Sequence, residues 1–308
     1  MSVTVCSDII DLDELIPRGV DNDREDVASR IPWIFQQTGI EIVEDDCTMK
    51  WPQEEMNFGD LFFWLSSYYY EVYEREVGIT NAFKACGTIS LPIRNWKQPE
   101  REDLRFFIRT QGWMKNMLMH TIYNNLDGIR EERPRIIFEP QLKQKYIIGG
   151  KRFTYKSEGA ATVRLQEGLV PIISYTGLFE GMTWDQFLLK TLSIMLGQLA
   201  KTTCIQNGNT GVLGQEIYVV GFCGRYVHVV RGLFPVDTIA RVHSQGCSKD
   251  GAFDLKFTRG YDLYSKKDWL EATRVLTRLY RYFLSGNIKA GAIQAYLQRA
   301  ANTKNNGP

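Results

Sequence analysis

The spacing of apolar residues along the chain predicts four long helices, because it repeats with the period of one buried helix face. Thr183 and Gln186 form a capping box in front of the third helix, and Ser265 and Asp268 form one in front of the fourth. Proline in the first turn suits the second helix. The predicted long helices are Asp60–Val77, Pro99–Gly128, Trp184–Ala200 and Ser265–Gly286, and a short one covers Val236–His243.

Between the second and third helices the period changes, and short β-branched or aromatic runs predict a meander of strands. These runs are RIIFEP, KYII, RFTYK, AATVRL and VPIISYT, separated by Gly-Gly and Glu-Gly pairs. Further on, EIYVVGF and RYVHVVR flank Cys223-Gly224 and predict a hairpin, and FDLKFT predicts one more strand. The pattern as a whole predicts a mixed α/β protein.

Composition agrees with an ordinary globular chain: 308 residues, 44% hydrophobic and 24% charged, can bury one sizeable core. No apolar run approaches the roughly 20 residues of a membrane-spanning helix. The first 20 residues are acidic and lack the apolar run of a secretory signal, so we expect a cytoplasmic protein with no membrane partner. The six cysteines have no Cys-x-x-Cys spacing, which argues against a disulfide framework and a structural zinc site.

The order of helix, strand meander, capped helix and strand over residues 100–231 resembles the common core of the PD-(D/E)XK phosphodiesterase superfamily. The resemblance implies an α/β (α+β) fold with a PD-(D/E)XK-like central mixed sheet flanked by helices. We expect residues 1–98 to form an N-terminal helical extension packed on that core. Residues 99–300 would form the core with its C-terminal helices, and residues 301–308 a disordered tail.

In that superfamily an acid leads one strand and an acid-x-Lys triplet ends the next, so that two carboxylates hold a divalent cation. Glu158 matches the first acid, whereas Thr176 and Leu178 stand where the resemblance requires a carboxylate and a lysine. Glu139 and Glu180 would restore a metal site if they converged on this pocket. Otherwise we expect no metal cofactor.

The runs PRIIFEPQLKQKY, YVVGFCGRYVHVVRG and FTRGYDLYSKKDWLEATRVLTRLYRYFLSG resemble a fungal family of mostly uncharacterised proteins with a degenerate core of this kind. Some fungal proteins of this kind are cyclodipeptide synthases that join arginine to a second amino acid taken from charged tRNA. This resemblance implies an aminoacyl-tRNA partner, arginyl-tRNA first, and secondary metabolism as the setting.

An aminoacyl ester is already activated, so attack by a second amine needs positioning and proton transfer more than it needs a metal. On the strand that lacks the triplet, Ser174 and Tyr175 are candidates for acyl acceptor or proton shuttle, and Gln198 matches a glutamine that the superfamily often points at the site. A guanidinium substrate requires a carboxylate partner. The candidates, each next to a predicted core strand, are Glu139, Glu158, Glu180 and Glu216.

Binding of tRNA requires basic groups on a common face. Arg274, Arg278 and Arg281 form one stripe on the last predicted helix, although a solvated helix surface explains that stripe equally well. A second basic cluster beside the meander comprises Lys143, Lys145, Lys151 and Arg152.

Two other functions fit the same residues. A working metal nuclease would use Mg²⁺ and Glu158, and a non-catalytic nucleic-acid-binding or interaction module would use the basic groups alone. The three histidines have no metal-ligand spacing, and His228 alternates with strand residues in the manner of a satisfied core histidine. No Walker loop and no Gly-x-Ser-x-Gly motif occurs, which leaves nucleotide-binding folds and serine hydrolases without support.

Overall fold

The fold is described from a computed structural model of the chain. The predicted helix Asp60–Val77 lies outside the described residues except for Ser67, and so does the tail. The described residues are 2–18, 67, 86–90, 105–124, 136–165, 168–178, 182–206, 214–223, 226–247, 251–262, 266–285, 287–291 and 293–294.

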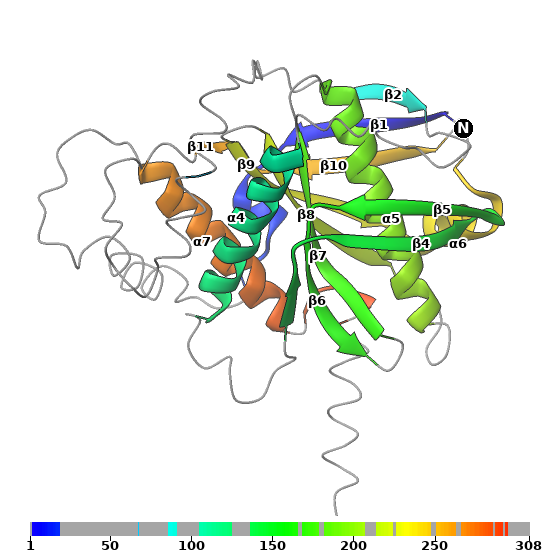
Figure 1. The fold of residues 1–308 in the computed structure, drawn as a ribbon. Helices are drawn as coiled ribbons and strands as arrows, with labels where there is room; N and C mark the ends of the chain where they lie inside the picture. Colours follow the sequence, from blue (N-terminus) through cyan, green and yellow to red (C-terminus); the bar gives the residue numbers. More distant parts are fainter. Residues whose placement is uncertain are drawn as a thin grey trace, which may run out of the picture.

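A nine-stranded mixed sheet forms the centre of the described structure (Figure 1). Its order is β2-β1-β10-β9-β8-β7-β6-β3, with β11 paired to β9. The pairs β7–β8 and β1–β10 are parallel, and the other neighbours are antiparallel. The strands are β1 Ser2–Ile9, β2 Cys86–Ser90, β3 Ile136–Glu139, β6 Ala160–Leu165, β7 Gly168–Leu178, β8 Gln215–Cys223, β9 Tyr226–Phe234, β10 Ala252–Phe257 and β11 Tyr261–Asp262.

Helices cover both faces of this sheet, which confirms the predicted α/β class with a mixed central sheet flanked by helices. On one face, α4 and α7 pack with Ile173 and Tyr175 of β7 in one apolar cluster. On the other face, α5 packs with Leu178 in a second cluster. A two-stranded ribbon, β4 with β5, lies outside α5 (Figure 1). The elements are α1 Leu12–Leu15, α4 Arg105–Asn124, α5 Trp184–Gln206, α6 Val236–Gln245, α7 Lys266–Leu284, β4 Leu142–Ile148 and β5 Lys151–Ser157.

The predicted helices and strands of the second half are confirmed, and local chemistry explains their ends. At the start of α5 the backbone N–H of Thr183 donates to Gln186 Oε1 at 2.9 Å, and the N–H of Gln186 donates to Thr183 Oγ1 at 3.3 Å. This reciprocal pair is the predicted capping box. His228 is buried, with Nδ1 3.3 Å from the carbonyl oxygen of Thr258, and is therefore a satisfied core histidine.

The structure differs from the prediction in two details. Within the expected N-terminal helical extension, the described residues 2–9 and 86–90 are strands at the edge of the sheet, where β1 pairs with β10 from far along the chain. The helix predicted in that segment lies outside the described residues apart from Ser67. The hairpin turn is shifted by one residue, since Cys223 pairs with Tyr226. The carboxylate of Asp268 accepts from Arg259 and from the backbone N–H of Asp262, and its predicted capping-box partner Ser265 lies outside the described residues.

Among the helices in the described part of the chain, none is long and apolar enough to cross a membrane. The described cysteines, Cys6, Cys223 and Cys247, carry free thiols.

Candidate functional site

Glu158 lies in the short connection from β5 to β6, beside the carboxyl end of β7. Its backbone N–H donates to the carbonyl oxygen of Tyr175 at 3.1 Å, and the N–H of Tyr175 donates to Gly159 O at 2.8 Å. Gly159 has φ +145°, and a Cβ there would meet the Tyr175 ring at 2.6 Å, so glycine is required. The carboxylate of Glu158 is thereby fixed at the end of the strand whose acid-x-Lys triplet is missing.

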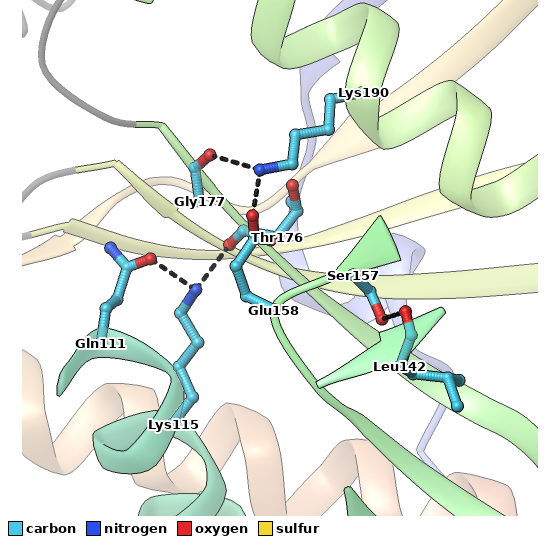
Figure 2. A network of polar contacts seen from close by, with 8 residues as sticks. All are labelled: Gln111, Lys115, Leu142, Ser157, Glu158, Thr176, Gly177 and Lys190. Atoms are coloured by element: carbon cyan, nitrogen blue, oxygen red, sulfur yellow. Dashed lines mark hydrogen bonds and ion pairs between the residues drawn. The ribbon is translucent and has the colours of Figure 1, made fainter. Parts of the chain in front are cut away.

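Two lysines converge on this point from opposite faces of the sheet (Figure 2). Lys190 of α5 forms an ion pair with Glu158 Oε1 and lies 3.4 Å from Gly177 O. Lys115 of α4 donates to Thr176 O at 3.0 Å and to Gln111 Oε1 at 2.7 Å. We call Glu158, Lys115 and Lys190 the β7-end cluster.

Small residues let the helices approach closely enough to deliver these side chains. Gly112, one turn from Lys115 on α4, faces the carbonyl oxygen of Glu158, which would be 3.2 Å from an added Cβ. On the other face, Phe187 of α5 packs over Gly221 of β8, where an added Cβ would meet its ring at 2.9 Å. Gly112 therefore makes room for the backbone of the site.

The electrostatics of the β7-end cluster follow from its burial, since Lys115, Lys190 and Glu158 are 0%, 4% and 7% exposed. Burial lowers the pKa of Lys115 to about 7, and the charge of Lys190 lowers it further while that of Glu158 opposes the shift. The ammonium also lies 4.7 Å from the centre of the Phe222 ring. A large fraction of Lys115 is therefore a neutral amine at physiological pH, able to accept a proton.

The described residues of this site offer a divalent cation few ligands. The cluster brings together one carboxylate and two amino groups, whereas magnesium is held by several oxygen ligands that carry negative charge. Within the described residues, no group of three or more His, Cys, Asp or Glu side chains is arranged to hold a metal. Glu180, one of the predicted metal or substrate ligands, lies outside the described residues.

Ser174 and Gln198 engage each other. The hydroxyl of Ser174 donates to Gln198 Oε1 at 2.9 Å, and Gln198 Nε2 donates to Ile172 O at 3.0 Å, all within the buried layer between β7 and α5. Tyr175 points to the opposite face, into the cluster shared with α4 and α7, where burial raises its pKa. Of the predicted catalytic residues that the structure describes, Glu158 is the one whose side chain belongs to the β7-end cluster, through its ion pair with Lys190.

The two predicted substrate-binding glutamates lie apart. Glu139 ends β3 and pairs with Ala160, next to the turn that carries Glu158. Glu216 lies near the start of β8 and accepts a hydrogen bond of 2.8 Å from Tyr282. It precedes Gly221, the residue paired with Thr176, by five positions, which is about 17 Å along a strand. The structure therefore brings Glu139 toward the site and leaves Glu216 far from it.

The predicted basic groups divide into two kinds. On α7, Arg278 is buried and paired with Asp13, and Arg274 pairs with Glu271, while Arg281 is partly exposed. Lys143, Lys145, Lys151 and Arg152 lie exposed on the β4–β5 ribbon.

Sequence reasoning missed Lys115 and Lys190, the two cations of the site. A signal was present, since each is a charged residue inside an apolar helical run, WMKNMLM and FLLKTLSIML. A lysine in such a run must either reach solvent or find polar partners inside.

The comparisons with known proteins do not assign the chain to a family. No protein-family model and no curated protein matches the chain. Function must therefore be argued from the β7-end cluster and its surroundings.

Proposed function

We propose that the protein is an aminoacyl-tRNA-dependent cyclodipeptide synthase that forms arginine-containing diketopiperazines at the β7-end cluster without a metal. The chain order α4, β3, β6, β7, α5, β8 supports a PD-(D/E)XK-like ancestry, since it runs helix, three-stranded meander, helix and strand. The β4–β5 ribbon is an insertion between the first two strands of that meander.

The observation that carries the proposal is the pair of amino groups beside Glu158. Where a metal nuclease needs a second carboxylate, this site has Lys115, a buried amine with a pKa of about 7. Transfer of an acyl group to an amine needs a group that accepts a proton near neutral pH, and a base of about this strength can do so.

In the proposed reaction the α-amine of one aminoacyl group attacks the ester carbonyl of the other. A C–N bond forms, the ester C–O bond breaks, and Lys115 passes the proton lost by the amine to the departing ribose oxygen. A second attack within the dipeptidyl ester closes the ring and releases the second tRNA. Glu158 Oε2 has no hydrogen-bond partner in the described structure and would hold the substrate's ammonium or guanidinium group. To reach the substrate, Lys115 must leave its contact with Gln111.

The test is product formation by the purified, chelator-treated protein supplied with arginyl-tRNA and a mixture of other aminoacyl-tRNAs. Mass spectrometry should detect an arginine-containing diketopiperazine. Replacing Lys115 with Met should lower its rate at least about 100-fold. K115R keeps the charge but not the low pKa, so it should not rescue the rate, whereas K267M, at an exposed lysine of α7, should leave it unchanged. A folded wild-type protein that yields no such product would overturn the proposal.

A second candidate is a metal-dependent nuclease, favoured by the ion pair between Glu158 and Lys190 at the head of β6. Acid and lysine side by side are also the parts of a phosphodiester-cleaving site. Cleavage of RNA or DNA that needs Mg²⁺ or Mn²⁺ and disappears in E158A would establish this function. Cleavage that persists in a chelator would count against it.

A further inference from the structure

The β4–β5 ribbon forms a sheet of its own beside the central one. Gly149 and Gly150, with φ of 54° and 70°, make the two-residue turn at its tip. The N–H of Gly149 donates to His243 O, near the C-terminus of α6, at 3.0 Å. The ribbon is therefore anchored at its tip as well as at its base.

The inner face of the ribbon is packed on α5. Tyr155 is 4% exposed and lies against Gly197, where an added Cβ would overlap its ring and lie 3.2 Å from Tyr146. Tyr146 stacks on Phe153 with ring centres 5.6 Å apart. These contacts fix the ribbon on α5 and so fix the direction of its outer face.

The outer face carries cations and no acid. Side chains alternate along a strand, so every second residue of each strand faces outward. None of the basic residues among them has an ion-pair partner in the described part of the chain. The outer-face residues are Lys143, Lys145 and Ile147 of β4 and Arg152, Thr154 and Lys156 of β5.

The register places two of these cations directly opposite each other. Lys143 pairs with Lys156 across the ribbon, and both are exposed. Like charges at directly paired positions destabilise an antiparallel pair. An anionic partner that binds between the two ammonium groups would remove this repulsion.

We propose that this outer face binds the phosphate backbone of RNA, and that Lys143, Lys145, Arg152 and Lys156 are its contacts. The inference rests on the proposed function, because it assigns the surface that receives the tRNA. It differs from the sequence-based cluster by adding Lys156 and leaving out Lys151, which pairs with Ile148 on the inner side.

Continuity with the β7-end cluster favours RNA over other anions. Ser157 ends β5 and Glu158 follows it at the site (Figure 2). The pair Lys143–Lys156 is next to the pair Leu142–Ser157 and therefore lies at the end of the ribbon nearest the site. From there the cations extend along the ribbon for about 13 Å at strand spacing, as far as Arg152. A polyanion lying along this row reaches the cluster with one end. An acidic protein or a lipid surface gains nothing from that connection.

The experiment measures binding of deacylated bulk tRNA by fluorescence anisotropy over a range of salt concentrations. In K143Q/K145Q/K156Q the slope of log affinity against log salt should fall by about 2–3, because three phosphate contacts are lost. The control R164Q/K267Q/K289Q removes the same charge from exposed residues off the ribbon, and its slope should not change. Equal slopes for the two variants would overturn the proposal.

The single variant K143E separates binding from folding. Opposite Lys156 it replaces a like-charge pair with an attractive one, so its melting temperature should rise while its tRNA affinity falls. A fall in both would mean that the lysine acts structurally. If the ribbon variants instead lose binding to anionic phosphatidylserine vesicles and keep binding to tRNA, the surface belongs to a membrane and the inference fails. Because the probe is deacylated tRNA, the binding experiment does not depend on catalysis. Absence of diketopiperazine formation with intact tRNA binding would therefore contradict the proposed function alone.

Discussion

Lys115 lies in an environment that is unusual for a lysine, because it is fully buried. Its Nζ has an amide oxygen and a carbonyl oxygen as acceptors, while the described carboxylate nearest to it is paired with Lys190. Neutral acceptors do not repay the loss of hydration of an ammonium ion. The folded protein therefore favours the neutral amine.

This preference predicts that stability depends on pH in a way that can be traced to one residue. In the folded state the pKa of Lys115 is about 7, against 10.5 for an unperturbed lysine. Between these values the unfolded chain binds more protons than the native one, so the free energy of unfolding rises with pH. One such group contributes up to about 1.4 kcal/mol per pH unit.

Urea unfolding of the wild type and of K115M at pH 6.5, 7.5, 8.5 and 9.5 measures this contribution. As pH rises, the free energy of unfolding of the wild type should increase relative to that of K115M. The same comparison with K267M should show no such trend. A constant difference between the wild type and K115M would mean that Lys115 stays charged when folded.

At the scale of elements, the contact of the ribbon with α5 depends on Gly197, whose lack of a side chain leaves room for Tyr155. Alanine is a better helix former than glycine by about 1 kcal/mol, so G197A would stabilise an exposed helix. Here the new methyl group overlaps the buried ring of Tyr155, which cannot move without lifting the ribbon. Overpacking of this kind costs about 1–3 kcal/mol, and we expect the clash to outweigh the gain in propensity.

Thermal unfolding of G197A, Y155L and the double variant tests this balance. The double variant should be more stable than the sum of the two single effects predicts, because the smaller side chain leaves room for the methyl group. Simple additivity would mean that the ring and the helix are not in firm contact. A displaced ribbon should also weaken tRNA binding in G197A.

Elements of the second half were predictable because their signals are local. The capping box of Thr183 and Gln186 and the double glycine at 149–150 each depend on a few neighbouring residues. The separation of β4 and β5 from the central sheet was not predictable, because the sequence pattern of a meander does not show which strands belong to which sheet. What decides it is the packing of Tyr155 on Gly197, a contact between residues 42 positions apart in the printed sequence.

The candidate site, too, could be predicted only in part. Glu158 could be proposed from its position before a strand, but its partners come from α4 and α5 on opposite faces of the sheet. No spacing in the sequence indicates that two helices will deliver lysines to one strand end. For β1 the reason is similar: it pairs with β10, about 250 residues away, and its own pattern carries no sign of that partner.

At the scale of the whole molecule, the first residues join the described fold into one unit. After β1, the backbone oxygens of Glu14 and Leu15 accept from Arg231 at 2.8 and 2.9 Å, and Tyr218 donates to Leu15 O at 3.0 Å. Asp13 is paired with Arg278 of α7 and with Arg18, and the hydrogen bond from Arg278 lowers its pKa. Both the burial of Leu15 and the ion pairs of Asp13 attach this segment, and they contribute different amounts to the free energy of unfolding.

Leu15 should contribute most of this attachment. It is 0% exposed, so L15A should lower the free energy of unfolding by about 2–5 kcal/mol. The side chain of Asp13 is 61% exposed, so water screens its ion pair with the buried Arg278, and D13N should lower the free energy of unfolding by less than L15A does. L233A, the same change at a leucine that is 49% exposed, is the matched control.

Guanidinium unfolding followed by tryptophan fluorescence and by far-ultraviolet circular dichroism decides whether the N-terminal segment belongs to the cooperative unit. If it does, L15A shifts both transitions together and leaves the m-value unchanged, because the same surface is exposed in one step. If L15A releases only the N-terminal segment, the m-value falls and the rest of the fold keeps its midpoint. The contacts of Leu15 with β8 and β9 cross the centre of the sheet, so we expect the first outcome.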